Sequence, residues 1–202
     1  MSDLFVDRAA DYDTRPMPAQ ISAGVVAALE GSIALSLDQT VLDFGAGTGL
    51  IATKIADRVA RVIAVDISPA MLSQLAAKPD LPANIEPVCH DLVDGALRTQ
   101  AHVVVSAMAL HHVQHTAPML RALHDELQPG GIFALADLDA EPGTFHPPDI
   151  EGVFHNGFDR QVLGHQLVQA GFEDVRFQTA CTVTRDGREY PIFLVVARRA
   201  GE

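Results

Sequence analysis

The sequence predicts an α/β fold built on a doubly wound, mostly parallel sheet. Strand and helix patterns alternate from residue 40 to about residue 175, which requires helices on both faces of a parallel sheet. A glycine-rich loop, Gly45 to Gly49, joins the first strand to the next helix. The chain then ends in two strands joined by a tight turn at Asp186-Gly187, so these two strands must be antiparallel to each other.

Each element follows from a local pattern. Strands are expected at residues 40–44, 61–66, 85–89, 101–106, 132–136, 175–183 and 190–197. Helices are expected at residues 18–30 and 50–60, after Ser68-Pro69, from Thr116 to the stop at Pro129-Gly130-Gly131, and from the cap at Asp159 to Gly171. In open sheets of this kind ligands bind beyond the carboxyl ends of the strands, so we expect the site at that edge.

Composition limits the class of protein. The 202 residues include 26 acidic and 14 basic side chains, a formal charge of -12, and such a surface repels a phosphate backbone, so no nucleic-acid partner is expected. Cys89 and Cys181 lie far apart, which favours a reducing compartment and a cytoplasmic location. No run of about 18 apolar residues is present, so we expect no membrane partner. We expect a single domain over residues 1–202, as a monomer or a homodimer.

The strongest local signal is VLDFGAGTGL at residues 41–50, which follows a strand and opens a helix. A dinucleotide fingerprint would place its third glycine at position 50, where this chain has leucine. Asp43 stands two residues before Gly45, and a carboxylate so close to the loop would repel a pyrophosphate but suit a cationic ligand with an amino group. The alternative interpretation is a structural glycine turn.

Two further acids end the next strands. Asp66 follows Gly45 by 21 residues, at a place where a carboxylate can accept both hydroxyls of an adenosine ribose. Asp91 ends the third strand, where it could accept from an adenine amino group. Each acid alone is compatible with a helix cap or a solvated loop residue. Together with the glycine loop they predict one adenosine site.

The chain resembles the class I S-adenosylmethionine-dependent methyltransferases over essentially its whole length. The resemblance rests on VLDFGAGTGL (41–50), VIAVDISPAML (62–72), VCHDL (88–92), VVVSAMALHHV (103–113) and LQPGGIFALADL (127–138), in the family's order and spacing. It implies a Rossmann-like, doubly wound seven-stranded sheet of order 3-2-1-4-5-7-6, with strand 7 antiparallel. It also implies an N-terminal helical lid within residues 1–30 and methyl transfer to a small-molecule acceptor. The stretch 136–159 is similar to a bacterial branch of the family.

The resemblance further implies S-adenosylmethionine as the cofactor and S-adenosylhomocysteine as the product. Binding residues carry over from the lid, where an aromatic residue reaches over the methionine part, and from the glycine loop and the strand ends. The expected cofactor-binding residues are Tyr12, Asp43, Gly45, Ala46, Gly47, Thr48, Gly49, Asp66, Ile67, Met71, Asp91, Leu92, Ser106, Ala107 and Met108.

Methyl transfer is an in-line displacement at an activated sulfonium carbon, so the protein mainly aligns the reactants and excludes water. A base is needed only where the nucleophile carries a proton of high pKa. The expected catalytic residues are His111, Asp137 and His155. We place the acceptor pocket between the lid, the end of the fourth strand and a substrate-side loop at residues 139–158. His155 is the preferred polar contact in that loop, because Phe154 and Phe158 should turn it inward.

Each candidate also has a structural interpretation. A histidine after the fourth strand can pack against the neighbouring loop, Asp137 can brace that loop, and His146 and His155 can be surface residues. Asp137, Asp139, His146 and His155 could also form a mixed metal site, but their spacing matches no compact ligand motif, so we expect no metal.

Two other functions compete with methyl transfer. A non-catalytic cofactor-binding or regulatory protein can have the same fold. A nicotinamide-dependent oxidoreductase is disfavoured by Leu50. The segment Ser106-Ala107-Met108-Ala109 stands where many amide and base N-methyltransferases carry an Asn/Asp-Pro-Pro-Tyr/Phe type of sequence. The sequence therefore leaves an oxygen, sulfur, carbon or amine nucleophile open.

Overall fold

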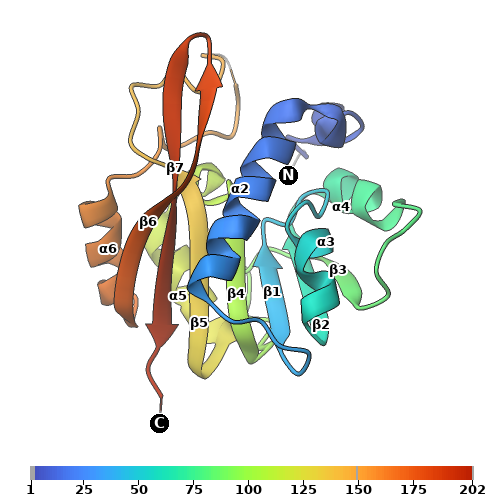
Figure 1. Cartoon of the computed structure of the whole chain (residues 1–202), viewed down its shortest axis with the longest axis vertical. Coiled ribbons are helices and arrows are strands. Elements are labelled where there is room, and N and C mark those ends of the chain that lie inside the picture. Colours follow the sequence, from blue (N-terminus) through green and yellow to red (C-terminus); the bar gives the residue numbers. More distant parts are fainter. Residues whose placement is uncertain (1–2, 149, 202) are drawn as a thin grey trace.

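The computed structural model describes residues 3–148 and 150–201 and contains one seven-stranded sheet (Figure 1). The strands are β1 (Thr40–Phe44), β2 (Arg61–Asp66), β3 (Ile85–Cys89), β4 (Ala101–Ala107), β5 (Leu127–Leu138), β6 (Phe172–Arg185) and β7 (Arg188–Arg199). Their order, β3-β2-β1-β4-β5-β7-β6, confirms the predicted order. Strand β7 is antiparallel to β5 and β6, and the other neighbouring pairs are parallel, as predicted. Residues 1, 2, 149 and 202, which fall within the predicted lid, loop and domain, lie outside the described residues.

Helices cover both faces of this sheet (Figure 1). The α-helices are α1 (Val6–Ala9), α2 (Pro16–Ser32), α3 (Ala52–Ile55), α4 (Pro69–Ala76), α5 (Thr116–Glu126) and α6 (Arg160–Gln169), and the 3-10 helices are η1 (Tyr12–Thr14), η2 (Ala56–Arg58) and η3 (Leu110–His112). Val41 packs with α2, α3 and α4, whereas its neighbour Leu42 packs with α5 and α6. Both are fully buried, because successive side chains of a strand face opposite layers and both layers are covered.

Two elements differ from the prediction. The helix expected at residues 50–60 is broken into α3 and η2, in a segment where β-branched Ile51, Thr53 and Ile55 disfavour a regular helix. The second difference is that Pro129-Gly130-Gly131 lies inside β5 rather than before it. The pairing passes from Ala101↔Leu127 to Val103↔Ile132, so three extra residues bulge out, and Gly130 takes the positive φ of 74° that the bulge requires.

The carboxyl ends of the parallel strands gather at one end of the molecule (Figure 1). The N-terminal segment, the connection at residues 139–158 and the turn of the β6–β7 hairpin lie at this same end. In that turn Asp186 and Gly187 both have positive φ, 51° and 75°, as a two-residue hairpin turn requires. Within the described ranges, no helix is both long and apolar enough to cross a membrane.

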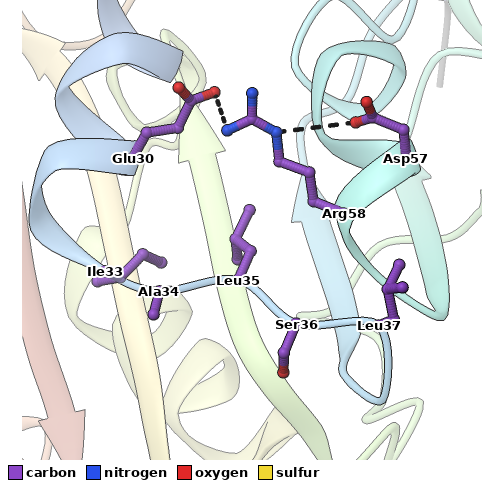
Figure 2. Close-up of a pocket in the computed structure, with 8 residues that line it drawn as sticks. All are labelled: Glu30, Ile33, Ala34, Leu35, Ser36, Leu37, Asp57 and Arg58. Atoms are coloured by element: carbon purple, nitrogen blue, oxygen red, sulfur yellow. Dashed lines mark ion pairs between the residues drawn. The ribbon is translucent and has the colours of Figure 1, made fainter.

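A surface pocket of about 370 Å³ lies at the opposite end of the sheet, between the end of α2 and η2 (Figure 2). Arg58 stands over it, with its guanidinium 2.6 Å from Glu30 and 3.8 Å from Asp57. The residues that line the pocket come before β1 or β2 in the chain, so the pocket adjoins the amino ends of these strands. It is therefore remote from the edge where an open parallel sheet binds its ligand.

Candidate functional site

The glycine loop between β1 and α3 has three glycines with positive φ, at 68°, 55° and 79°. A Cβ at Gly45 would stand 2.3 Å from the Cβ of Ala109, and one at Gly49 would stand 2.4 Å from Leu75. Both positions therefore need glycine for packing as well as for conformation. A Cβ at Gly47 would meet nothing within 4 Å, so the loop faces open space there.

Asp43 is buried beneath this loop, with its Oδ2 3.2 Å from the N–H of Ala52. Burial raises the pKa of Asp43 to about 7, against the effect of the Ala52 hydrogen bond, and the nearby charge of Asp66 adds to the rise. The carboxylate has no ion pair with a described residue. A cation reaching this position would supply the missing partner.

Asp66 joins the end of β2 to the glycine loop. Its Oδ2 accepts the N–H of Gly47 at 2.7 Å, and its Oδ1 accepts the N–H of Ser68 at 2.8 Å. Burial raises the pKa of Asp66, although both hydrogen bonds lower it. Each carboxylate oxygen keeps a second lone pair, so the group can still accept from two hydroxyls.

The remaining predicted residues, which follow β2 and β3 in the chain, have different environments. Asp91 Oδ1 accepts the N–H of Val93 at 2.9 Å and so caps its own turn. Leu92 and Met71 are buried in the core, whereas Ile67 is 60 % exposed. Among these four residues, only Ile67 and the half-buried Asp91 therefore present side-chain surface to a ligand.

The three residues predicted at the end of β4, Ser106, Ala107 and Met108, have different environments. Ser106 pairs with Phe44 and Val105 pairs with Asp43, so the side chain of Ser106 faces the layer opposite to Asp43. Its buried hydroxyl has no hydrogen-bond partner among the described residues. Met108 has a positive φ of 58°, and its N–H donates to the carbonyl of Ala136 at 2.9 Å. Ala107 is half-buried at the strand end.

The N-terminal segment, residues 3–15, contains α1 and η1 and packs over the glycine loop and the start of α4. Thr48 Oγ1 donates to Asp13, which also lies 2.7 Å from Lys78 Nζ. Asp3 accepts from Ser68 Oγ at 2.8 Å and from the N–H of Ala70 at 3.1 Å. These polar contacts, rather than a large apolar interface, attach the segment to the domain.

The segment carries two aromatic side chains, Tyr12 and Phe5. Burial raises the pKa of Tyr12, Arg15 opposes the rise, and the charges of Asp13 and Asp66 add to it. The ring of Phe5 makes an edge contact with His112, at 5.2 Å between ring centroids, so the segment covers η3 as well.

His111 and Asp137 form a buried pair at the ends of β4 and β5. His111 Nδ1 lies 2.7 Å from Asp137 Oδ1, and the backbone N–H of His111 donates to Oδ2 at 3.1 Å. The side chains are 1 % and 0 % exposed. Burial alone would raise the pKa of Asp137, but the charge and hydrogen bonds of His111 hold it below its usual value. The ionised carboxylate can only accept, so Nδ1 carries a proton. The buried Nε2 atom has no partner among the described residues.

Two more imidazoles surround this pair. The ring of His112 lies 4.1 Å from that of His111, and the ring of His146 lies 5.0 Å from it, between centroids. His112 Nδ1 lies 2.6 Å from the carbonyl oxygen of Gly152. Burial lowers the pKa of both His112 and His146 to about 4, and a positive charge on His111 acts in the same direction. Both rings are therefore neutral near pH 7.

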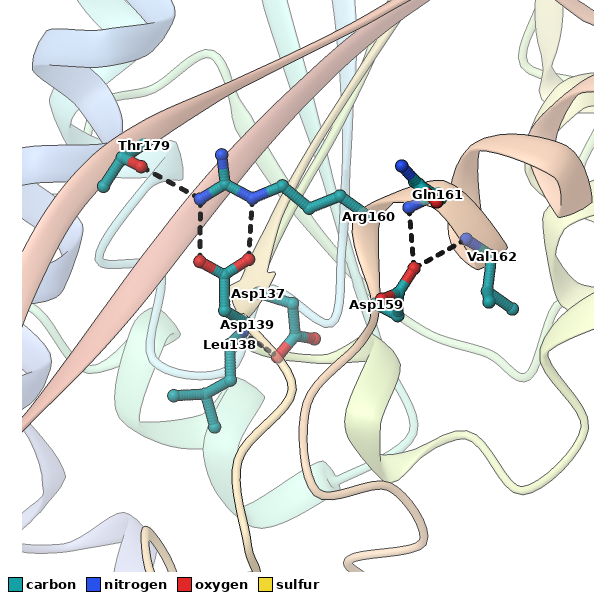
Figure 3. A network of polar contacts seen from close by, with 8 residues as sticks. All are labelled: Asp137, Leu138, Asp139, Asp159, Arg160, Gln161, Val162 and Thr179. Carbon is teal, nitrogen blue, oxygen red and sulfur yellow. Dashed lines mark hydrogen bonds and ion pairs between the residues drawn. The ribbon is translucent and has the colours of Figure 1, made fainter.

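The connection at residues 139–158 forms a loop whose two ends meet. Asp139 and Phe158 form a short parallel bridge. Arg160 makes two hydrogen bonds of 2.7 Å to the carboxylate of Asp139 and a third, of 2.9 Å, to Thr179 (Figure 3). Asp139 is thereby committed to a structural ion pair. Asp159 caps α6 by accepting from two backbone N–H groups, as predicted (Figure 3).

Within this loop the structure separates the two histidines named from the sequence. His146 lies against the His111 ring, with its Nε2 buried. His155 Nε2 lies instead 2.9 Å from the carbonyl oxygen of Val113, and its ring packs on Phe158. Phe154, expected to help anchor His155 inward, is 50 % exposed, while its backbone N–H donates to the carbonyl of His111. An acceptor contact by His155 stays a prediction.

Comparison with known proteins agrees with this geometry. A family model described as a methyltransferase domain matches residues 41–131. An uncharacterized methyltransferase of Synechocystis is 31% identical over 154 residues, which cover 72% of this chain and 72% of that protein. The chain belongs to the class I S-adenosylmethionine-dependent methyltransferases.

Solved structures show the same fold at low sequence identity. A methyltransferase in complex with the Haloferax volcanii Trm112 methyltransferase activator has a TM-score of 0.81 and 18% identity, with 99% of each chain covered. Phosphoethanolamine N-methyltransferase 2 of Haemonchus contortus, in complex with S-adenosyl-L-methionine, has a TM-score of 0.75 and 14% identity. In that comparison the match covers 99% of the methyltransferase described here and 60% of the Haemonchus chain.

The residues of this methyltransferase fit the family's cofactor in three observable respects. The backbone at Gly47 borders open space. The buried Asp43 has no cationic partner in the described part of the chain, and an amino group would provide one. The carboxylate of Asp66 keeps free lone pairs at the end of β2. The described residues include no group of three or more histidines, cysteines or carboxylates placed to hold a metal ion.

Sequence reasoning gave His146 no preferred role, although the structure places it beside His111. The only local signal was its position after Phe145, which is buried and packs on Tyr190 at 5.2 Å between ring centroids. The contact of Asp13 with Thr48 carried no sequence signal, because it joins residues 35 positions apart.

Proposed function

We propose that this methyltransferase binds S-adenosylmethionine at the carboxyl edge of the sheet and transfers the methyl group, by in-line displacement, to a small-molecule acceptor. The observation that carries the proposal is the buried His111–Asp137 pair beside the glycine loop. Ala109, two residues before His111, packs so closely against Gly45 that no side chain fits between them. A proton-accepting nitrogen is thereby held next to the expected cofactor loop.

Each part of the site has a distinct task in this proposal. The cofactor supplies an electrophilic methyl group on its sulfonium. Asp43 binds a cationic amino group, Asp66 binds hydroxyl groups, and Asp137 orients His111 so that Nε2 can accept a proton. The N-terminal segment and the loop at residues 139–158 exclude water. Both contact His112, the N-terminal segment through Phe5 and the loop through the carbonyl of Gly152, and this shared contact favours an enclosed pocket for a small acceptor.

Two measurements test this function. Calorimetry with S-adenosylmethionine and S-adenosylhomocysteine should show binding of both. Incubation with S-adenosylmethionine and a panel of hydroxyl, amine, thiol and carboxylate acceptors should then release S-adenosylhomocysteine. Binding without turnover across the panel would favour the non-catalytic alternative, and the absence of binding would contradict both.

Replacing Asp66 by alanine should weaken cofactor binding by roughly 1.5–3 kcal/mol, because a charge-assisted pair of hydrogen bonds is lost. That cost corresponds to about 10- to 150-fold in Kd. Asp66→Asn keeps one acceptor oxygen and should lose less. The control is Asp94→Ala, an exposed acid after β3. An unchanged Kd for Asp66→Ala in calorimetry would remove the residue from the site.

Cofactor affinity should fall as the pH is lowered below about 7. The raised pKa means that Asp43 is protonated in the free protein below that pH, whereas a cationic amino group requires the carboxylate. Affinity should fall by up to about tenfold per pH unit, because the free protein takes up a proton on Asp43 that it must release when the cofactor binds. Asp66, whose pKa burial also raises, acts in the same direction. Asp43→Asn should therefore bind weakly with a flatter pH profile. A wild-type Kd independent of pH between 5.5 and 7.5 would contradict this role.

The N-terminal segment should act as a lid whose protection increases when the cofactor site is filled. Its attachment depends on a few polar contacts, through Asp3 and Asp13, at least partly open to solvent, and such segments open at low free-energy cost. Hydrogen exchange over residues 3–17 should slow on addition of S-adenosylhomocysteine. Equal exchange in both states, with slowing confined to the glycine loop, would show that the segment is a fixed cover.

A further inference from the structure

His111 and His146 each have a buried Nε2 atom with no hydrogen-bond partner in the described chain. Their rings lie 5.0 Å apart between centroids and are tilted by 38°. Buried polar atoms are almost always paired, so two unpaired nitrogens on neighbouring rings call for a ligand group that can satisfy both. The pair is no metal site, since no third suitable ligand joins it among the described residues.

The position of His146 is fixed by contacts of the two preceding residues with β6 and β7. Phe145, the residue before it, is 4 % exposed, and its carbonyl accepts a hydrogen bond from Arg185. Thr144 Oγ1 lies 2.9 Å from the hydroxyl oxygen of Tyr190, on the same hairpin. Strands β6 and β7 therefore hold the backbone that places the His146 ring over the His111–Asp137 pair.

The two nitrogens differ in what they offer. His111 Nδ1 is committed to Asp137, so His111 Nε2 can accept a proton. Near pH 7 His146 is neutral, because burial depresses its pKa to about 4 and a positive charge on His111 would only lower it further. A neutral imidazole with a proton on Nε2 donates one hydrogen bond. A hydroxyl group both donates and accepts at one oxygen, so it can satisfy both nitrogens at once.

The acidity of the hydroxyl narrows the class of methyl acceptor further. An imidazole base removes a proton more readily from a phenol-type hydroxyl, with a pKa of about 10, than from an aliphatic alcohol. The side chains nearby are rings as well: Phe5 and His112 pack edge to face at 5.2 Å, and Phe145 packs on His146 at 4.9 Å, between centroids. Flat acceptors pack well against such rings.

We infer that the acceptor is a compound with a phenol-type hydroxyl, held between His111 Nε2 as proton acceptor and His146 Nε2 as hydrogen-bond donor. The inference rests on the proposed function. As the oxygen–carbon bond forms, the hydroxyl proton passes to His111 Nε2. The electron pair of the breaking carbon–sulfur bond leaves with the sulfur, which gives the methyl ether and S-adenosylhomocysteine. His146 is a specificity residue, since it contacts the oxygen but takes no proton.

The test uses phenol and 1-naphthol as probes, with aniline, thiophenol, benzoate and cyclohexanol as matched acceptors lacking the phenolic hydroxyl. Phenol and 1-naphthol should bind the protein–S-adenosylhomocysteine complex in calorimetry and should be methylated with at least tenfold higher kcat/KM than the others. His146→Phe, which keeps the ring but removes both nitrogens, should weaken naphthol binding at least tenfold without changing cofactor affinity. His146→Gln, whose amide can donate from a similar position, should recover part of that loss.

The control is His165→Gln, an exposed histidine on α6, which should match the wild type. Methylation of aniline or thiophenol in preference to the phenols would overturn the hydroxyl class while leaving the methyltransferase function intact. Unchanged naphthol binding in His146→Phe, or no phenol binding by the cofactor-loaded wild type, would overturn the inference. Failure to bind S-adenosylmethionine would instead count against the proposed function.

Discussion

Replacing His111 by glutamine should lower kcat by roughly 10²- to 10⁴-fold, the range expected when a general base is lost. The ring nitrogen that accepts the proton disappears, whereas the cofactor contacts expected at Asp43 and Asp66 lie on other strands and are untouched. The dissociation constant for S-adenosylmethionine should therefore stay within about twofold. Turnover is measured by release of S-adenosylhomocysteine with the best acceptor of the panel.

Asp137→Asn should lower kcat in the same way, because an amide at this position can bind His111 in the wrong tautomer. The double variant should be little worse than either single one, since the two residues act as a unit. His165→Gln on the exposed face of α6 controls for the substitution itself. Thermal melts check that the variants fold. Two folded single variants with normal kcat would leave the pair a structural brace.

Replacing Glu126 by glutamine should destabilise the fold by about 3 kcal/mol. Glu126 is fully buried at the end of α5, and its carboxylate accepts the backbone N–H groups of Leu97, Arg98 and Thr99 at 2.7–3.1 Å. An amide offers a single acceptor oxygen and turns an N–H toward these donors, so at least one buried donor loses its partner. Arg98 has an unfavourable positive φ of 55°, which the bond from its N–H to Glu126 helps to stabilise.

The melting temperature should fall by roughly 6–12 °C for a chain of this length. The matched control is Glu141→Gln. Glu141 also accepts two backbone N–H groups, from Thr144 and Phe145, but it is partly open to water, which can replace a lost partner. Its melting temperature should change much less. Equal small shifts in both variants would show that the Glu126 contacts contribute little to stability.

The sequence by itself determined the architecture and the edge of the sheet at which the site is expected. Alternating periods of two and of about 3.6 residues depend on local burial, so the strands and their order could be predicted from the pattern and the family resemblance. The glycine loop could be predicted for the same reason, since its signal lies within ten consecutive residues, 41–50. Asp66 could be predicted in the same way, because it is the last residue of a buried strand.

Two irregularities inside these elements could not be predicted from the local sequence pattern. The bulge at Gly130 depends on how β5 registers against Ala101 of β4, which the sequence of β5 does not encode. The break between α3 and η2 had only the weak signal of β-branched residues, which tertiary contacts often override.

Only the tertiary structure decided which polar groups of the long connection reach the site. His146 and His155 lie nine positions apart in one loop and look alike as sequence. Packing of Phe145 on Tyr190 turns His146 over the His111–Asp137 pair, whereas the Val113 carbonyl engages the ring of His155. These contacts join residues 42 or more positions apart, so they exist only once the sheet has brought β4, β5 and β7 together. The free energy of a loop conformation depends on such distant partners, which no local pattern records.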